Sequence, residues 1–238
     1  MKLYSHVITN DTGLTPNPFH DFCTSALCTP SHRNARLGEG DWLIGNSRRR
    51  DGNHLVYAMR ISEVLSMNEY FHDGRFERKK PKPEGTCIEQ CGDNIYYRGD
   101  DDQWKRLPSR FHNNRSDFIK DVGNDFAGRP VFVAEHFYYF GCGRVVIPNK
   151  LAEVICGGIG IRDKSGLADY FVEWLENNYR PGVLGTPHDM SNRAGETGLM
   201  LTGLTPNDAL RTEHRKREVH GPKGGSVTES QPHNRGCH

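Results

Sequence analysis

The chain has 238 residues, of which 35% are hydrophobic and 26% are charged, and its formal net charge at pH 7 is +1. So small a net charge excludes a global electrostatic field that recruits nucleic acid, and any such contact must come from local basic clusters. A chain of this length can bury one core, and its 26 glycines and 13 prolines predict a loop-rich protein.

The first part of the chain is rich in strand-forming residues. KLYSHVITN, at residues 2–10, predicts an opening strand that ends at an Asp-Thr-Gly turn. GDWLIGN (40–46) and HLVYAMRISEVL (54–65) predict two further strands. Between them, RRRDGN contains an Asp-Gly pair that favours a tight turn, so we expect a hairpin with arginines at its tip.

Helices and a second group of strands follow. Ser66 and Glu69 form a capping-box pattern, which predicts a helix over MNEYFHDGRF. IYY and QWKRL predict a hairpin around an acidic turn, and GRPVFVAEHFYYFG, at residues 128–141, is the most apolar strand candidate. SGLADYFVEWLENNY, at residues 165–179, has apolar residues at helical spacing and predicts the best-defined helix.

This order of elements predicts an α+β fold with a mainly antiparallel sheet that closes partly into a barrel, together with a few helices. Residues 1–181 form the predicted domain. Residues 182–238 are rich in Gly, Pro, Asn, Thr and charge, which bury too little apolar surface to offset the entropy of ordering. We therefore expect a mostly disordered tail, which is dispensable for folding from about residue 186 onward. Without a signal-peptide pattern or a bilayer-spanning apolar run, we expect a cytoplasmic protein.

Several stretches together resemble a known family. In order, they are MKLYSHVITNDTGLTPNPF, CTSALCTP, GDWLIG, LVYAMRISEVLSMNEYF, GDNIYYR and EHFYYFG. They are similar to the second of the nucleotide-modification-associated domain families of bacteria and phages, over roughly residues 1–160. The resemblance implies a part in nucleic-acid base modification and implies no catalytic residue. GDWLIG followed by LVYAMRISEVL also resembles the core of PUA-like and EVE-like domains, which often read a modified base.

Reading a base that is extruded from its stack requires an aromatic face and a few fixed polar groups. The candidate ligand-binding residues are Asn17, Phe19, Trp42, Asp93, Asn94, Tyr138, Tyr139 and Phe140. A strand tryptophan such as Trp42 is also typical of a core, and Asp93 and Asn94 also suit a turn. Because three successive aromatic residues cannot face one side of a strand, at least one of residues 138–140 is expected to face outward or line a cavity.

The segment from residue 11 to residue 33 is long and locally stiff, because Pro16 and Pro18 fix their own φ and bias the preceding residues toward extended geometry. Long ordered loops in compact domains tend to carry function, so we expect this loop to line the ligand pocket. The candidate phosphate contacts are Arg33, Arg48, Arg49 and Arg50.

Two other functions stay open beside a base-binding module. A base-modifying or nucleotide-processing enzyme would use Asp11, Cys28, His32 and Asp41, with the carboxylates as acid or base. A phage or defence protein would instead bind a free nucleotide signal. The sequence contains no Walker motif, dinucleotide fingerprint or zinc-deaminase signature. The expected partner is nucleic acid or a nucleotide, and not a membrane, while the cofactor and the oligomeric state are left open.

The seven cysteines have irregular spacings, which favour reduced thiols over a disulfide framework. Cys23 with Cys28 and Cys87 with Cys91 could be drawn as zinc ligands. Their spacings differ from those of structural zinc sites, which prefer two intervening residues, so we expect no metal and buried thiols.

Overall fold

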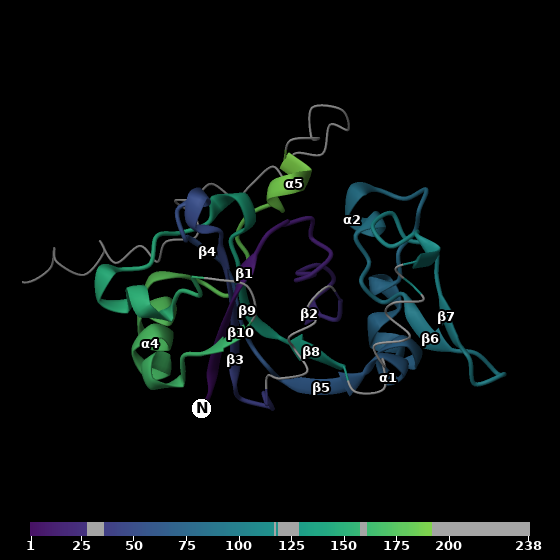
Figure 1. Cartoon of the computed structure of the whole chain (residues 1–238), viewed down its shortest axis with the longest axis horizontal. Helices are drawn as coiled ribbons and strands as arrows, with labels where there is room; N and C mark the ends of the chain where they lie inside the picture. Colours follow the sequence, from purple (N-terminus) through teal and green to yellow (C-terminus); the bar gives the residue numbers. More distant parts are fainter. Residues whose placement is uncertain (28–35, 117, 119–128, 158–160, 192–238) are drawn as a thin grey trace, which may run out of the picture.

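The structure is a computed structural model that describes residues 1–27, 36–116, 118, 129–157 and 161–191 (Figure 1). Its largest element is a six-stranded sheet with the strand order β10-β1-β3-β4-β9-β11. In that order the strands are β10 (Ile161–Asp163), β1 (Leu3–Ile8), β3 (Trp42–Ser47), β4 (Leu55–Arg60), β9 (His136–Tyr139) and β11 (Gly182–Val183). β1 and β3 run parallel, with Leu3 opposite Trp42, and β9 and β11 also run parallel.

A second sheet continues from the first. It has the order β2-β8-β5, with β2 at Cys23–Ser25, β8 at Pro130–Ala134 and β5 at Glu63–Ser66. The predicted strands 54–65 and 128–141 each run through both sheets. The first is interrupted at Ile61 and Ser62 and the second at Glu135. The two long strands therefore pair with each other in both sheets. Their parts β4 and β9 pair in the first sheet, and their parts β5 and β8 pair in the second.

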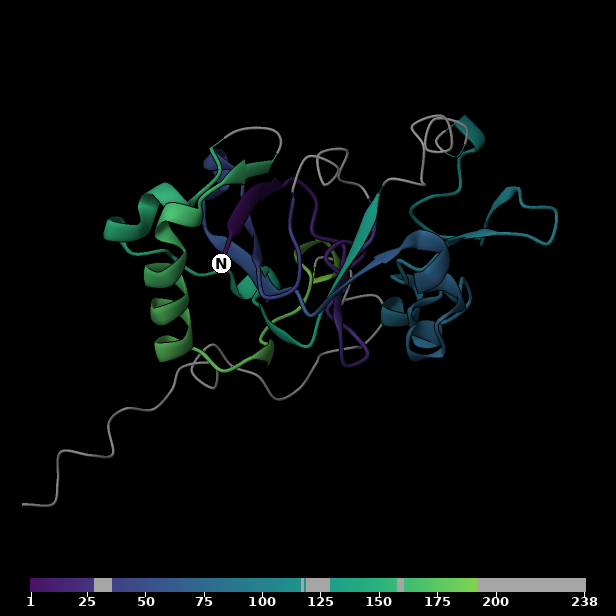
Figure 2. The ribbon, with the colours of Figure 1, turned by 90° about the horizontal axis from the view of Figure 1, so that it is seen from below.

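The helices lie at the two ends of the molecule. α4 (Ala168–Asn178) is at one end, and α1 (Met67–His72), α2 (Cys87–Gln90) and the hairpin of β6 (Tyr96–Arg98) and β7 (Trp104–Arg106) are at the other in both views (Figures 1 and 2). We call residues 67–116 the α1–β7 lobe. Short 3-10 helices lie at Arg49–Asp51, Gly74–Lys79, Gly141–Gly143, Asn149–Val154 and Ser165–Leu167, and α5 is at His188–Ser191.

Local signals account for several of these elements. α1 begins at the predicted capping box, where the Glu69 backbone N–H donates to Ser66 Oγ at 3.2 Å and the Ser66 N–H donates to Glu69 Oε2 at 2.8 Å. α4 buries Phe171 and Leu175 against the sheet, as the apolar spacing predicts. No helix of the described residues is long and apolar enough to span a bilayer.

The alternation of side chains along β9 and beyond divides the aromatic run between two cores. Tyr138 and Phe140 pack with Trp42 in the cluster that α4 covers. Tyr139 points to the opposite face and packs with Tyr57 in a second cluster. A third cluster packs the α1–β7 lobe against β8 and the segment of residues 14–27. The expectation that at least one of the three faces outward or lines a cavity is wrong for the described pockets, because Tyr139 turns to the opposite face and is buried in the second core.

The fold class is α+β, and six of the eight strand pairings in the described residues are antiparallel. The predicted partial closure into a barrel is not found there. β10 and β11 remain the two edges of the large sheet, and no ladder joins them within the described ranges. The sheet opens because β4 and β9 bend away into β5 and β8 instead of curling the sheet onto itself.

The described fold continues past residue 181, where the sequence predicts the end of the domain. β11 pairs with β9, and the Leu184 N–H donates to the Tyr139 carbonyl at 2.7 Å. The Cys142 N–H donates to the Thr186 carbonyl at 2.7 Å. Residues 182–191 thus belong to the sheet and its edge, while the rest of the predicted tail lies outside the described residues.

These contacts predict different results for two truncations. A chain that ends at Ser191 keeps all of the contacts given above and should melt like the full chain. A chain that ends at Gly185 loses the Thr186 contact and the N–H groups of His188 and Asp189 that bond Asp11. At about 1 kcal/mol for each hydrogen bond and 2–4 °C for each kcal/mol, its melting temperature should fall by about 6–12 °C. Equal melting of both truncations, measured by circular dichroism, would show that residues 186–191 add no stability.

Candidate functional site

A polar pocket of about 80 Å³ lies where three strands end, and we call it the Asp11 pocket. β1, β3 and β9 run in the same direction, since β1 is parallel to β3 and both β3 and β9 are antiparallel to β4. The carboxyl ends of these three strands therefore lie at the same end of the sheet. The lining residues are Ile8, Thr9, Asn10, Asp11, Ser47, Arg48, Asp51, Val56, Gly141, Arg144, His188 and Asp189.

The carboxyl group of Asp11 is fixed by two donors. The Tyr139 hydroxyl donates to Oδ1 at 2.5 Å, and the His188 backbone N–H donates to Oδ2 at 3.0 Å. The backbone of Asp11 is also held, because its carbonyl accepts from the Asp189 N–H at 2.9 Å. The residue is only 6% exposed. Burial raises the pKa of Asp11, and this effect outweighs the two hydrogen bonds, which lower it. The pocket thus holds an oriented carboxyl group that takes up a proton more readily than an exposed aspartate does.

The charges around Asp11 are mixed. Arg48 Nε lies 2.7 Å from Asp51 Oδ2, and this hydrogen bond lowers the pKa of Asp51. His188 Nδ1 lies 3.2 Å from Asp189 Oδ1. Together with Arg144, the lining carries three carboxyl groups, two guanidinium groups and one imidazole. Such a lining suits a ligand with hydrogen-bond donors, such as the amino group of a base, better than it suits a bare phosphate.

The structure brings together three residues that the sequence analysis selected separately. Asp11, Arg48 and Tyr139 come from three distant parts of the chain and meet at this pocket. The sequence analysis missed Arg144 and His188. The His-Asp pair at residues 188 and 189 was the available signal, but it lies in the segment predicted as a tail.

The other aromatic candidates lie in the core. Trp42 is 1% exposed, and its ring packs on Tyr138 and meets His136 edge-on, with centroids 6.4 and 5.7 Å away. Phe140 is buried against Tyr179. Phe19 is buried as well. These positions give the rings a packing role, and their contact with a ligand stays a prediction.

Three polar candidates form a buried network at the base of the α1–β7 lobe. The amide nitrogen of Asn17 donates to the Cys91 carbonyl at 2.8 Å. The carboxylate of Asp93 accepts from Tyr70 at 2.7 Å and Thr24 at 2.8 Å. Asn94 Nδ2 donates to the Tyr70 carbonyl at 3.0 Å. All three candidates are 1% exposed, so this network joins segments of the protein, and its role in reading a base stays a prediction.

Asp41 is far from Asp11 because it precedes β3 whereas Asp11 follows β1. Its Oδ1 accepts from the Lys2 backbone N–H at 2.7 Å and its Oδ2 from the Gly38 N–H at 3.0 Å, so it ties the beginnings of two strands together. Arg49 and Arg50 are exposed beside Arg48 but do not line the pocket. Cys28, His32 and Arg33 lie outside the described residues.

The loop that begins at residue 11 contributes to three hollows. Asp11 lines the pocket named for it, and Thr12 and His20 line two others. Residues 13–19 are mostly buried. Whether this loop contacts a ligand stays a prediction.

Two of the four cysteines that were considered as zinc ligands, Cys23 and Cys91, are buried thiols. Burial raises the pKa of Cys23 to about 12 and that of Cys91 to about 12, which keeps both protonated at neutral pH. Within the described ranges, no group of three or more His, Cys, Asp or Glu residues is placed to hold a metal ion.

Comparison with protein families identifies the chain. The sequence model of nucleotide modification associated domain 2 matches residues 1–194. The chain belongs to this family. Membership of the nucleotide modification associated domain 2 family links the chain to nucleotide modification, and the match includes β11, α5 and the whole Asp11 pocket. No curated protein and no solved structure matches the chain.

Proposed function

We propose that this protein binds a nucleobase of a nucleic acid at the Asp11 pocket, as part of base modification. The observation that carries the proposal is the buried Asp11 carboxyl group, held by Tyr139 and the His188 backbone and directed into a polar pocket. An extruded base is also the ligand that the resemblance to PUA-like and EVE-like domains implies.

The chemistry of the carboxyl group defines what it can recognise. When ionised, Asp11 accepts hydrogen bonds from an exocyclic amino group, as acidic residues do from cytosine N4. When protonated, it donates one to a ring nitrogen or a carbonyl oxygen. Because Tyr139 and His188 hold both oxygens in one orientation, little conformational entropy is lost when a base binds.

The substitution Asp11→Asn tests this proposal, since it keeps the shape of the side chain and replaces one acceptor oxygen with a donor. Titration of short oligonucleotides that differ in one extrudable base should show a changed base preference, by about 1–3 kcal/mol between the best and the worst base. Asp41→Asn is the matched control, because Asp41 is an equally short acid at the other end of the sheet. Unchanged base preference in folded Asp11→Asn would refute the proposal.

The pH dependence of binding has a defined sign. The pKa of Asp11 is raised, so the acceptor form of the carboxyl group is lost as pH falls through this raised pKa. The preference for bases with an amino group should therefore weaken on acidification, starting at a higher pH than an exposed aspartate would give. Asp11→Asn should show a flat profile over the same range. A wild-type profile as flat as that of the variant would contradict a role for Asp11 ionisation.

A second candidate is an enzyme that transfers protons at this pocket. It is favoured by the raised pKa of Asp11 and by the His188 side chain, which lines the same pocket. Mass spectrometry of nucleosides from cells that produce the wild type or Asp11→Asn separates the two functions. A nucleoside change that requires Asp11 supports the enzyme, whereas an unchanged profile together with measurable oligonucleotide binding supports the binding module.

A further inference from the structure

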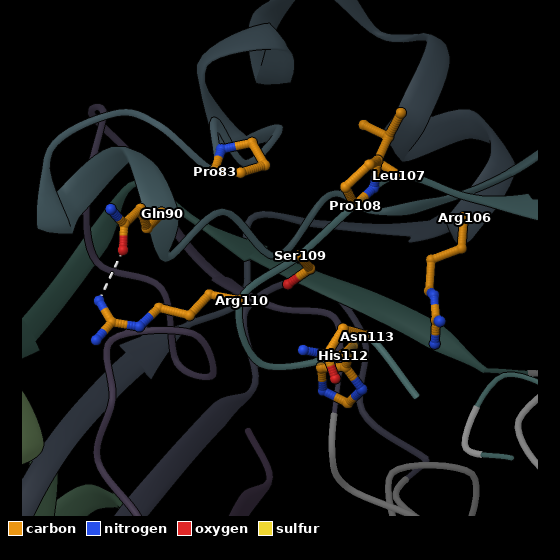
Figure 3. A pocket seen from close by; sticks show the side chains of 9 residues that line it. All are labelled: Pro83, Gln90, Arg106, Leu107, Pro108, Ser109, Arg110, His112 and Asn113. Carbon is orange, nitrogen blue, oxygen red and sulfur yellow. Dashed lines mark hydrogen bonds between the residues drawn. The ribbon is translucent and has the colours of Figure 1, made fainter. Parts of the chain in front are cut away.

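A second and larger pocket, of about 570 Å³, lies on the α1–β7 lobe (Figure 3). We call it the arginine pocket. Its lining residues are Pro83, Gln90, Arg106, Leu107, Pro108, Ser109, Arg110, His112 and Asn113. Figure 3 shows Arg106 and Arg110 on either side of the pocket, with Ser109, His112 and Asn113 between them.

The charge of this lining is entirely basic. It has two arginines and a histidine and no carboxyl group, in contrast to the three carboxyl groups of the Asp11 pocket. Arg110 Nη1 donates to the side-chain oxygen of Gln90 at 2.7 Å, and Arg106 Nη1 donates to the Asn114 carbonyl at 3.1 Å. Both acceptors are neutral, and no ion pair with a carboxylate is formed by either guanidinium group among the described residues.

Most other basic residues of this lobe are neutralised by a carboxylate. The ion pairs are Arg75 with Asp73 and Glu63, Lys80 with Glu77, Lys82 with Glu89, Arg98 with Asp102 and Lys105 with Asp101. Arg106 and Arg110 therefore make this pocket positively charged, whereas most other basic residues of the lobe are paired with a carboxylate. An anionic ligand would satisfy it.

Both guanidinium groups are held in place. Besides their hydrogen bonds, Arg106 lies over the ring of Phe118, with Cζ 5.4 Å from the centroid, and Arg110 lies 5.8 Å from the centroid of Phe111. Ser109 is buried between them, and its Oγ accepts from the Phe111 N–H at 3.4 Å. Donors that are held before binding lose little side-chain entropy when they contact a phosphate.

A small hollow shares lining residues with both this pocket and the Asp11 pocket. It is lined by Thr12, Cys87, Cys91, Arg110, Phe111, Asp189 and Met190. Arg110 also lines the arginine pocket, and Asp189 also lines the Asp11 pocket. Both short helices contribute to its lining, α2 through Cys87 and α5 through Asp189 and Met190. The hollow thus shares one lining residue with each of the two pockets, which places them on neighbouring parts of the surface.

We propose that the arginine pocket binds the phosphodiester backbone of the strand whose base enters the Asp11 pocket. The ligand is accordingly a polynucleotide and not a free nucleotide, because a base at one site and phosphates at a separate site require a chain between them. The base contact rests on the proposed function above, whereas the phosphate contact rests on the arginines alone.

The double variant Arg106→Gln/Arg110→Gln tests this proposal against fluorescently labelled single-stranded DNA and RNA oligonucleotides. Two phosphate contacts on a single strand account for a slope of about 1.4 in the plot of log affinity against log salt concentration, and the variant should lose it. Affinity at low salt should fall by about tenfold or more, with the base preference unchanged. The matched control is Lys82→Gln/Lys105→Gln, which removes two charges of the same lobe that are already paired with Glu89 and Asp101.

Each outcome decides the proposal. An unchanged salt slope in the arginine variant, an equal loss in the lysine control, or no oligonucleotide binding by the wild type overturns it. An equal loss of binding to a mononucleotide also overturns it, because the pocket would then hold the phosphate of a free nucleotide. The proposed base site can fail while the phosphate site stands. In that case Asp11→Asn would leave the base preference unchanged, whereas the arginine variant would still lose affinity and part of the salt dependence of binding.

Discussion

Replacing Lys79 with methionine should lower the free energy of unfolding by about 3–5 kcal/mol, the usual cost of removing one partner from a buried charged network. Lys79 is 1% exposed, and its ammonium group donates three hydrogen bonds. The acceptors are the carbonyl and the side-chain oxygen of Asn17, both at 2.9 Å, and the carbonyl of Phe22 at 2.7 Å. Methionine fills the space but leaves all three oxygens without this donor.

The charge of Lys79 matters as well as its hydrogen bonds. Burial lowers the pKa of Lys79 to about 8, although the attraction of Asp93 raises it in part. Without the ammonium group, the buried carboxyl group of Asp93 loses its nearby positive charge. We therefore expect the double variant Lys79→Met/Asp93→Asn to lose less stability than the sum of the two single variants.

Lys82→Met is the matched control for Lys79→Met. Lys82 lies three residues further along, has a side chain that is 70% exposed and pairs with Glu89 at the surface, where such pairs contribute about 0–1 kcal/mol. Urea unfolding should show a free energy of unfolding within about 1 kcal/mol of the wild type for the control and about 3–5 kcal/mol lower for Lys79→Met. Thermal unfolding should show a melting temperature about 10 °C lower for Lys79→Met. Equal stability of the two variants would mean that the three hydrogen bonds of Lys79 contribute nothing to folding.

Replacing Gly141 with alanine should destabilise the protein by about 2–4 kcal/mol and disturb the Asp11 pocket at the same time. Gly141 has a φ of +54°, and a Cβ there would lie 2.1 Å from the backbone oxygen of Thr186. Since that contact is with backbone, residues 185–188 must move away. Their movement withdraws the His188 N–H from Asp11 Oδ2.

Gly143→Ala separates this effect from a general loss of turn flexibility. Gly143 ends the same 3-10 helix, and a Cβ there meets nothing within 4 Å. Its melting temperature and base preference should equal those of the wild type, whereas Gly141→Ala should melt lower and discriminate less between bases. If Gly141→Ala binds each base as the wild type does, then residues 185–188 have no part in the pocket.

Much of the fold could be predicted because its signals are local. Strand-forming residues predict β1 and β3, the Asp-Gly pair of the turn after Ser47 precedes β4, and the Ser66–Glu69 pair starts α1 where expected. These features depend on neighbouring residues, so they are visible without knowledge of the rest of the chain. Alternation along residues 138–140 correctly places Tyr139 on the other face of its strand, but only the tertiary structure shows that both faces are covered and all three rings are buried.

The sequence by itself therefore predicted β1, β3 to β9, helices α1 and α4, the family resemblance and the choice of Asp11, Arg48 and Tyr139 as candidates, but not β2, β10 or β11. Only the tertiary structure decided that these three meet, because the contact of Asp11 with Tyr139 spans 128 positions and depends on the common direction of β1 and β9. It also placed His188 on Asp11 and buried Trp42, since burial depends on what packs against a strand and not on the strand's own residues. A polar side chain such as that of Lys79 looks exposed in the sequence, and only its distant acceptors make its burial favourable.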